Sequence, residues 1–178
     1  MDALCNSWSA PYRLKELPAG SAGAVNFQSA VVGTVQIPAS YQLVYDLQPS
    51  PLVLIGGGEA GQVATSSQGG LTYDFNGGSG VAYTTLKQTS GNTLFLDGPG
   101  SHVALGSGAD TVVASTGNNV IATGTGANAV FLGSGNNYVA SEGTDTIVSG
   151  TGNDTIEVTG NALIYAQGGA GVRRPHTA

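Results

Sequence analysis

Polar side chains, all but one of them acidic or amide, recur at a nearly constant spacing through the second half of the chain. Neighbours in the series are nine residues apart, with one interval of eight, and the series is Asn92, Ser101, Asp110, Asn119, Asn128, Asn137, Asp145 and Asp154. Carboxylate oxygens are ligands that Ca²⁺ prefers, whereas an amide side chain donates and accepts hydrogen bonds and can link stacked strands without a metal. The spacing therefore offers two chemistries, calcium binding and a hydrogen-bonded ladder.

A repeat of nine residues positions these side chains. Read in nines from Gln88, the chain is QTSGNTLFL, DGPGSHVAL, GSGADTVVA, STGNNVIAT, GTGANAVFL, GSGNNYVAS, the shorter EGTDTIVS, and GTGNDTIEVT. Small residues and Gly in the first half favour a tight turn, and the triplet that follows favours a short strand. Two residues after each polar position stands an apolar one, which we expect to face a core: Leu94, Val103, Val112, Ile121, Val130, Val139, Ile147 and Ile156.

Short strands of this kind must stack on one another, because one of them alone cannot bury its apolar side. The sequence therefore predicts an all-β parallel β-solenoid, or β-roll, with neighbouring coils about 4.8 Å apart. With two nonamers to a coil, one edge carries Asn92, Asp110, Asn128 and Asp145. The other edge carries Ser101, Asn119, Asn137 and Asp154.

The repeats GSGADTVVA and GTGNDTIEV resemble the GGxGxDxUx nonapeptide of the repeats-in-toxin (haemolysin-type) calcium-binding β-roll family. The resemblance covers residues 88–159, with weaker echoes in GGLTYDFNGG and GGSGVAYTT before them. It implies a module of a secreted bacterial protein, in which the turn Asp and turn carbonyls hold Ca²⁺ between adjacent coils.

This chain departs from the family pattern at most of its polar positions. Only Asp110, Asp145 and Asp154 keep the carboxylate, and they are the candidate Ca²⁺ ligands. Because affinity rises with the number of carboxylates, such calcium sites should be weak, in the millimolar range of extracellular modules. The alternative for these three residues is turn capping. For the amides, the alternative to metal binding is a structural turn ladder of stacked side chains, formed by Asn92, Asn119, Asn128 and Asn137.

Composition agrees with a solenoid and sets limits on function. Gly contributes 29 of 178 residues, and charged residues only 9% of the chain, against about 25% in an average domain. The formal net charge is -6, and Lys87 is the only basic residue between Lys15 and Arg173, which disfavours nucleic acid as a partner. No apolar run is long enough to span a membrane, and the single cysteine, Cys5, cannot form an internal disulfide.

The sequence divides into four parts. Residues 1–22 are a leader that either caps the solenoid or docks onto a neighbouring molecule. Residues 23–87 are irregular β-strands that open the solenoid, residues 88–166 are the nonapeptide β-roll, and residues 167–178 are a flexible tail. Within the opening part, alternation places Leu71, Tyr73 and Phe75 on one side of a strand.

No catalytic constellation is visible, so we expect no enzymatic activity. His102 and His176 have no spacing suited to zinc or to a nucleophile pair. Four aromatic residues have two possible roles, packing in the core or lining a sugar-binding face: Tyr73, Phe75, Tyr83 and Phe131.

The leading interpretation is a secreted bacterial structural protein, outside the cell or on its surface, that self-associates into filaments or an extracellular or biofilm matrix. Open ends of a stack of coils allow another copy to continue it. One alternative is a calcium-binding module for folding or export of a secreted protein. Another is a carbohydrate-binding module that binds an extracellular polysaccharide.

Overall fold

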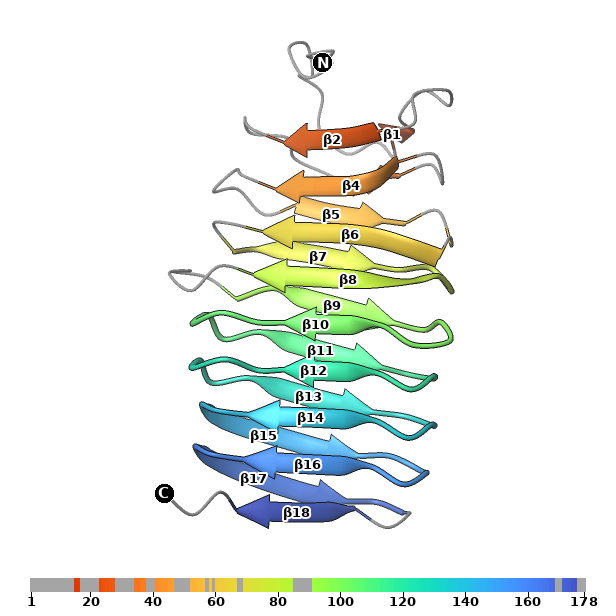
Figure 1. Cartoon of the computed structure of the whole chain (residues 1–178). Coiled ribbons are helices and arrows are strands. Elements are labelled where there is room, and N and C mark those ends of the chain that lie inside the picture. Colours follow the sequence, from red (N-terminus) through yellow and green to blue (C-terminus); the bar gives the residue numbers. More distant parts are fainter. Residues whose placement is uncertain are drawn as a thin grey trace.

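Equivalent strands of successive coils lie side by side in this computed structural model, and together they form a parallel β-solenoid (Figure 1). The structure describes residues 15–16, 23–27, 34–37, 41–46, 52–56, 58, 60–66, 69–84, 91–168 and 171–175. These residues contain strands and turns and no helix, so none of them forms a helix that could cross a membrane. The predicted all-β parallel solenoid is confirmed.

Two nine-stranded sheets make up the solenoid, and the chain alternates between them. The odd-numbered sheet contains β1 (Lys15–Glu16), β3 (Thr34–Gln36), β5 (Leu52–Ile55), β7 (Leu71–Asp74), β9 (Thr93–Leu96), β11 (Thr111–Ala114), β13 (Ala129–Leu132), β15 (Thr144–Ser149) and β17 (Asn161–Ala166). The even-numbered sheet contains β2 (Gly23–Phe27), β4 (Tyr41–Asp46), β6 (Ala60–Ser66), β8 (Ser79–Thr84), β10 (His102–Ala104), β12 (Val120–Ala122), β14 (Tyr138–Ser141), β16 (Thr155–Val158) and β18 (Val172–Pro175).

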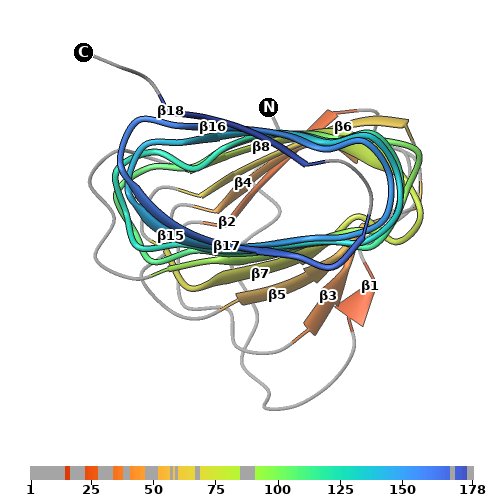
Figure 2. The ribbon, with the colours of Figure 1, turned by 90° about the horizontal axis from the view of Figure 1, so that it is seen from below.

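The pairing register follows the nonapeptide repeat. Val112 in β11 lies between Leu94 in β9 and Val130 in β13. Equivalent positions of every second nonamer therefore stack on one another. In the opening coils the register is less regular, with shifts between Gly23 and Ala24 and between Ala60 and Gln62. Seen along the stack, the later coils superpose as a flattened oval (Figure 2).

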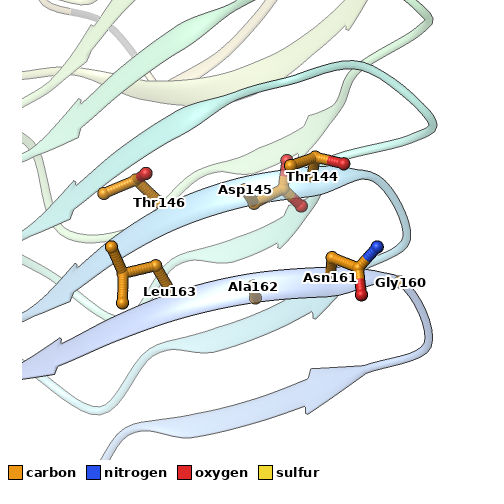
Figure 3. Close-up of a pocket in the computed structure, with 7 residues that line it drawn as sticks. All are labelled: Thr144, Asp145, Thr146, Gly160, Asn161, Ala162 and Leu163. Atoms are coloured by element: carbon orange, nitrogen blue, oxygen red, sulfur yellow. The ribbon is translucent and has the colours of Figure 1, made fainter.

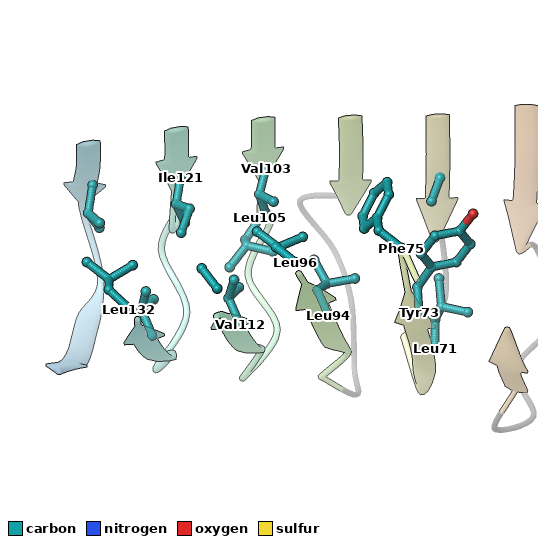
Figure 4. Close-up of a cluster of buried hydrophobic side chains, with 14 of the residues drawn as sticks. Leu71, Tyr73, Phe75, Leu94, Leu96, Val103, Leu105, Val112, Ile121 and Leu132 are labelled. Carbon is teal, nitrogen blue, oxygen red and sulfur yellow. The ribbon is translucent and has the colours of Figure 1, made fainter. Parts of the chain in front are cut away.

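A continuous apolar core fills the space between the two sheets (Figure 4). All the apolar residues predicted to face inward from the nonamers are at most 4% exposed. Burial of each such side chain contributes about 1.5–3 kcal/mol, so the core is a main source of the stability of the stack. The predicted alternation in the opening part is also confirmed, since Leu71, Tyr73 and Phe75 are buried.

The widest side chains of the core lie in the opening coils. The rings of Tyr73 and Phe75 meet edge to face with centroids 4.9 Å apart, and the Tyr73 hydroxyl donates to Oε1 of Gln62 at 2.6 Å. Burial and the neighbouring Asp74 carboxylate raise the pKa of Tyr73. This hydroxyl therefore stays protonated as an internal hydrogen-bond donor.

Turns of successive coils approach so closely that some positions accept only Gly. A Cβ atom at Gly126 would overlap the carbonyl oxygen of Gly108 in the coil before. Gly117, which has a φ of +84°, lies equally close to the turn of the coil before, at the carbonyl oxygen of Gly98. The Gly positions of the nonamer thus bring the turns together and align the polar residues that follow them.

Both ends of the chain differ from the boundaries that the sequence indicates. Lys15 and Glu16 of the predicted leader form β1, while the remainder of residues 1–22 lies outside the described residues. Residues 167–178 were expected to be a flexible tail, but Val172–Pro175 form β18, which pairs in parallel with β16. A strand forms there because the edge of β16 offers backbone groups that need partners.

Candidate functional site: two buried rows of turn residues

The polar residues of the repeat form two rows, one at each edge of the oval. The first turn row is Asn92, Asp110, Asn128 and Asp145, and these residues stand at the start of alternate strands of the repeat, β9 to β15. The second turn row is Ser101, Asn119, Asn137 and Asp154, before β10 to β16. All eight side chains are buried, at most 3% exposed. Their hydrogen-bonding groups must therefore find partners inside the protein.

Hydrogen bonds between neighbouring coils connect the first turn row. The backbone N–H of Asn92 donates to Oδ1 of Asp110 at 2.6 Å, and its side-chain Nδ2 donates to the same oxygen at 2.8 Å. Asn128 repeats this pattern with Oδ1 of Asp145, at 3.0 and 2.9 Å. Between these pairs, the backbone N–H of Asp110 donates to Oδ1 of Asn128 at 2.9 Å. Each side chain thus accepts from the coil before it.

The second turn row has the same arrangement. Asn119 donates from its backbone N–H and its Nδ2 to Oδ1 of Asn137, both at 3.0 Å. Asn137 donates from the same two groups to Oδ1 of Asp154, at 3.0 and 2.9 Å. The structure therefore joins the four predicted ladder residues to one another or to an Asp of the next coil.

The three candidate calcium ligands have different surroundings. The Asp145 carboxylate has both oxygens in hydrogen bonds, because its Oδ2 accepts from the hydroxyls of Thr123 and Ser141, each at 2.6 Å. In contrast, Oδ2 of Asp110 and Oδ2 of Asp154 are buried and have no hydrogen-bond partner among the described residues. Burying an unpaired carboxylate oxygen is costly, and a cation is one group that would offset this cost.

Asp110 and Asp154 therefore fit a calcium ion better than Asp145 does. Each has one oxygen that no protein donor occupies, and Ca²⁺ prefers such oxygens. No group of three or more His, Cys, Asp or Glu side chains gathers at one point within the part of the chain that the structure describes. A Ca²⁺ ion at either Asp would take most of its ligands from turn carbonyls, and when bound it would supply the positive charge that a buried carboxylate lacks.

Burial raises the pKa of Asp110, and the two hydrogen bonds from Asn92 lower it without cancelling the effect of burial. The ionised carboxylate is thus less favourable at this position than in water. A neighbouring cation would favour the ionised form and reverse the direction of the shift.

Electrostatic repulsion explains why neutral amides alternate with carboxylates in the first turn row. Asn and Asp alternate in the first turn row, so an amide donor stands beside each carboxylate. Two carboxylates in adjacent coils would lie about 4.8 Å apart and repel one another in a poorly solvated interior. The alternation avoids that contact.

Several polar residues take part in this region that the sequence analysis did not identify. Asn118, Asn136 and Asn153 form an outer row, in which the backbone N–H of each later coil donates to Oδ1 of the earlier one at 2.8 Å. The paired GNN and GND letters before β12, β14 and β16 are the signal that could have predicted it. Thr123 and Ser141, which contact Asp145, hold the ninth position of two nonamers, a position that is apolar in most of the others.

The four aromatic residues that could pack in the core or line a sugar-binding face have different surroundings in the structure. Tyr73 and Phe75 are in the core, whereas Phe131 is 43% exposed. The Tyr83 side chain lies outside the described residues.

Comparison with known proteins agrees with this geometry. Residues 106–139 and 139–158 match the family model described as the RTX calcium-binding nonapeptide repeat (4 copies). Searches of curated proteins and of solved structures found no match to the chain. The matched residues include both Asp110 and Asp154 and the ladders between them, and repeats of this family bind Ca²⁺. Residues 106–158 of this chain are therefore similar to RTX calcium-binding nonapeptide repeats.

Proposed function

We propose that this β-roll is a structural repeat module of a secreted protein, and that copies associate end to end into filaments or an extracellular matrix. The observation that carries this proposal is the unpaired outer edge of the final coil. On its outer edge, no strand among the described residues pairs with β17 or with β18. Unpaired strand edges are templates for another chain.

Side chains of β17 also remain uncovered. Ala162 and Ile164 pair with the buried residues Asp145 and Ile147 of β15 but are themselves only partly buried. Leu163 is 54% exposed. Next to them is an open pocket lined by Thr144, Asp145, Thr146, Gly160, Asn161, Ala162 and Leu163 (Figure 3). A further coil supplied by a second copy would cover this surface and bury its apolar side chains.

The ladders support a stack that needs no metal. Side-chain amides donate hydrogen bonds to the next coil from Asn92, Asn119, Asn128 and Asn137. These hydrogen bonds link neighbouring coils, which is the role that a bound cation would otherwise have. Association through the final coil should therefore persist after Ca²⁺ is removed.

Sedimentation velocity and negative-stain microscopy of the full chain, in millimolar Ca²⁺ and in excess chelator, test this proposal. Leu163→Lys should abolish large assemblies, because a charge on an edge strand opposes pairing with another strand. Val120→Lys is the matched control, since Val120 is 38% exposed on the face of the even-numbered sheet, away from the final coil. A wild-type protein that sediments as a monomer in both buffers would disprove self-association.

A second function is favoured by a separate observation, the unpartnered Oδ2 atoms of Asp110 and Asp154. These atoms support a calcium-binding module that aids the folding or export of a secreted protein. In this case Ca²⁺ would convert a disordered chain into a folded monomer, which circular dichroism during a Ca²⁺ titration would detect. Folding in chelator would exclude this function.

A further inference from the structure

Three aromatic side chains stand in one line on the outer face of the odd-numbered sheet. Phe95 in β9 pairs with Val113, which pairs with Phe131 in β13, and the line continues through Val148 to Tyr165 in β17. We call Phe95, Phe131 and Tyr165 the aromatic row. It occurs once in every second coil of the repeat.

The aromatic row is exposed, and in β9 and β13 the neighbours of its rings along the strand are buried. Phe95 is 38%, Phe131 43% and Tyr165 52% exposed, while Leu94 and Val130 are within the core. Exposed aromatic groups on a flat sheet favour aggregation, and a grouped set of them usually marks a binding surface. The valines between them show that the outward position does not require a ring.

The period of the aromatic row suggests a ligand with a matching repeat. Successive rings are two strands apart, about 9.6 Å. In an extended β-1,4-linked polysaccharide, alternate sugars turn the same face to one side, at a distance of the same size. The C–H groups on the flat face of a pyranose stack on aromatic rings. Successive rings of the aromatic row can therefore contact alternate sugars of the chain.

Polar groups beside the aromatic row fit the hydroxyls of such a chain. Thr93, Thr111 and Thr146 form a parallel line two residues before it, and all three are partly exposed. Their hydroxyls can donate to and accept from sugar hydroxyls. Over β9–β17, no outward-facing residue of the odd-numbered sheet is charged, and the whole chain carries a net charge of -6. The surface thus suits a neutral polysaccharide and would repel an anionic one.

We propose that the aromatic row binds an extended, neutral β-1,4-linked polysaccharide that runs along the solenoid axis. This activity goes beyond the proposed self-association and does not depend on it, because the aromatic row lies on the side of the stack. It would attach the module to a glycan outside the cell.

Two probes test the proposal with the full chain: depletion from solution by amorphous cellulose, and calorimetric titration with cellohexaose. Wild-type protein should bind both. Phe95→Ala and Phe131→Ala should each weaken binding about fivefold, the effect of losing one aromatic stacking contact. Tyr138→Ala is the control, because Tyr138 is a partly exposed aromatic residue on the other sheet.

A double variant tests the spacing itself. Val113→Phe combined with Phe131→Val keeps the apolar composition of the face but places two rings in adjacent coils. It should bind cellohexaose at least fivefold more weakly than wild type. Equal binding by this variant, or no binding of either probe by wild type, would overturn the proposal.

The same variants identify the competing occupant, a second copy of this chain. If wild type ignores both probes and the alanine variants lose self-association, the face is a contact between copies and the polysaccharide proposal is wrong. Phe95→Ala separates the two proposals, since Phe95 lies in β9, far from the final coil: this variant should weaken cellohexaose binding but retain assembly.

Discussion

Asn92 donates two hydrogen bonds to a single oxygen of Asp110, one from its backbone N–H at 2.6 Å and one from its side-chain amide at 2.8 Å. The same two-donor contact recurs between Asn128 and Asp145 and between Asn137 and Asp154. It gives hydrogen-bond partners to two buried donors of one coil and to one buried carboxylate oxygen of the next. The second oxygen of the Asp takes no part in this contact. The contact explains why this repeat can hold Asn at positions where the nonapeptide that it resembles has Asp.

Asn137→Ala should destabilise the solenoid by about 2–4 kcal/mol. The change removes the amide donor to Asp154 and leaves the backbone N–H and Nδ2 of Asn119 without their buried acceptor. Urea unfolding followed by circular dichroism measures the effect. The matched control is Asn136→Ala in the same turn, whose exposed side chain accepts one hydrogen bond. An equal loss for both variants would show that the inner ladder has no special weight.

Asn128→Asp should make the stack depend on calcium. The new carboxylate would lie between Asp110 and Asp145, with no amide to donate to Oδ1 of Asp145. Repulsion among buried carboxylates should lower the melting temperature in chelator, and millimolar Ca²⁺ should restore most of it. Thermal unfolding in the two buffers measures both effects. A variant as stable in chelator as wild type would contradict the role given to the alternating amides.

Asp110→Asn should stabilise the protein increasingly as pH rises. The folded-state pKa of Asp110 lies above its ordinary value of 3.8, so between these two values the folded protein binds more protons at this site than the unfolded chain does. Wild-type stability from this group is therefore greatest below pH 3.8 and is lost as pH rises through the folded-state pKa. The stability difference between variant and wild type should grow over that window and then level off. A difference that is constant with pH would refute the assignment.

The architecture was largely predictable, because it follows from a period that many residues share. A single apolar position in each nonamer, from Leu94 to Ile156, sufficed to predict the two sheets and their core. The opposite edges of the oval also followed from placing two nonamers in a coil. Coils without the nonamer, such as β2 to β6, have register shifts that no repeat indicates.

The candidate site was less predictable, since it depends on contacts that cross between the turns of a coil and its neighbours. All three repeat Asp residues look alike in the sequence, yet Asp145 receives two hydroxyls from Thr123 and Ser141 and the other two do not. Of the aromatic row, only Phe131 was considered for a sugar-binding face, and the reason is related. Its members recur at every second coil, an interval longer than the repeat on which the sequence analysis was based.

If side-chain ladders hold the coils together without metal, folding of the chain should not depend on calcium. Far-UV circular dichroism should record thermal unfolding of the full chain in excess chelator and in millimolar Ca²⁺. We predict β-structure with a cooperative transition in chelator, and a rise in melting temperature of only about 1–2 °C with Ca²⁺, since an ion near its dissociation constant adds about 0.4 kcal/mol. A chain that is disordered in chelator and folds only when Ca²⁺ is added would contradict the claim.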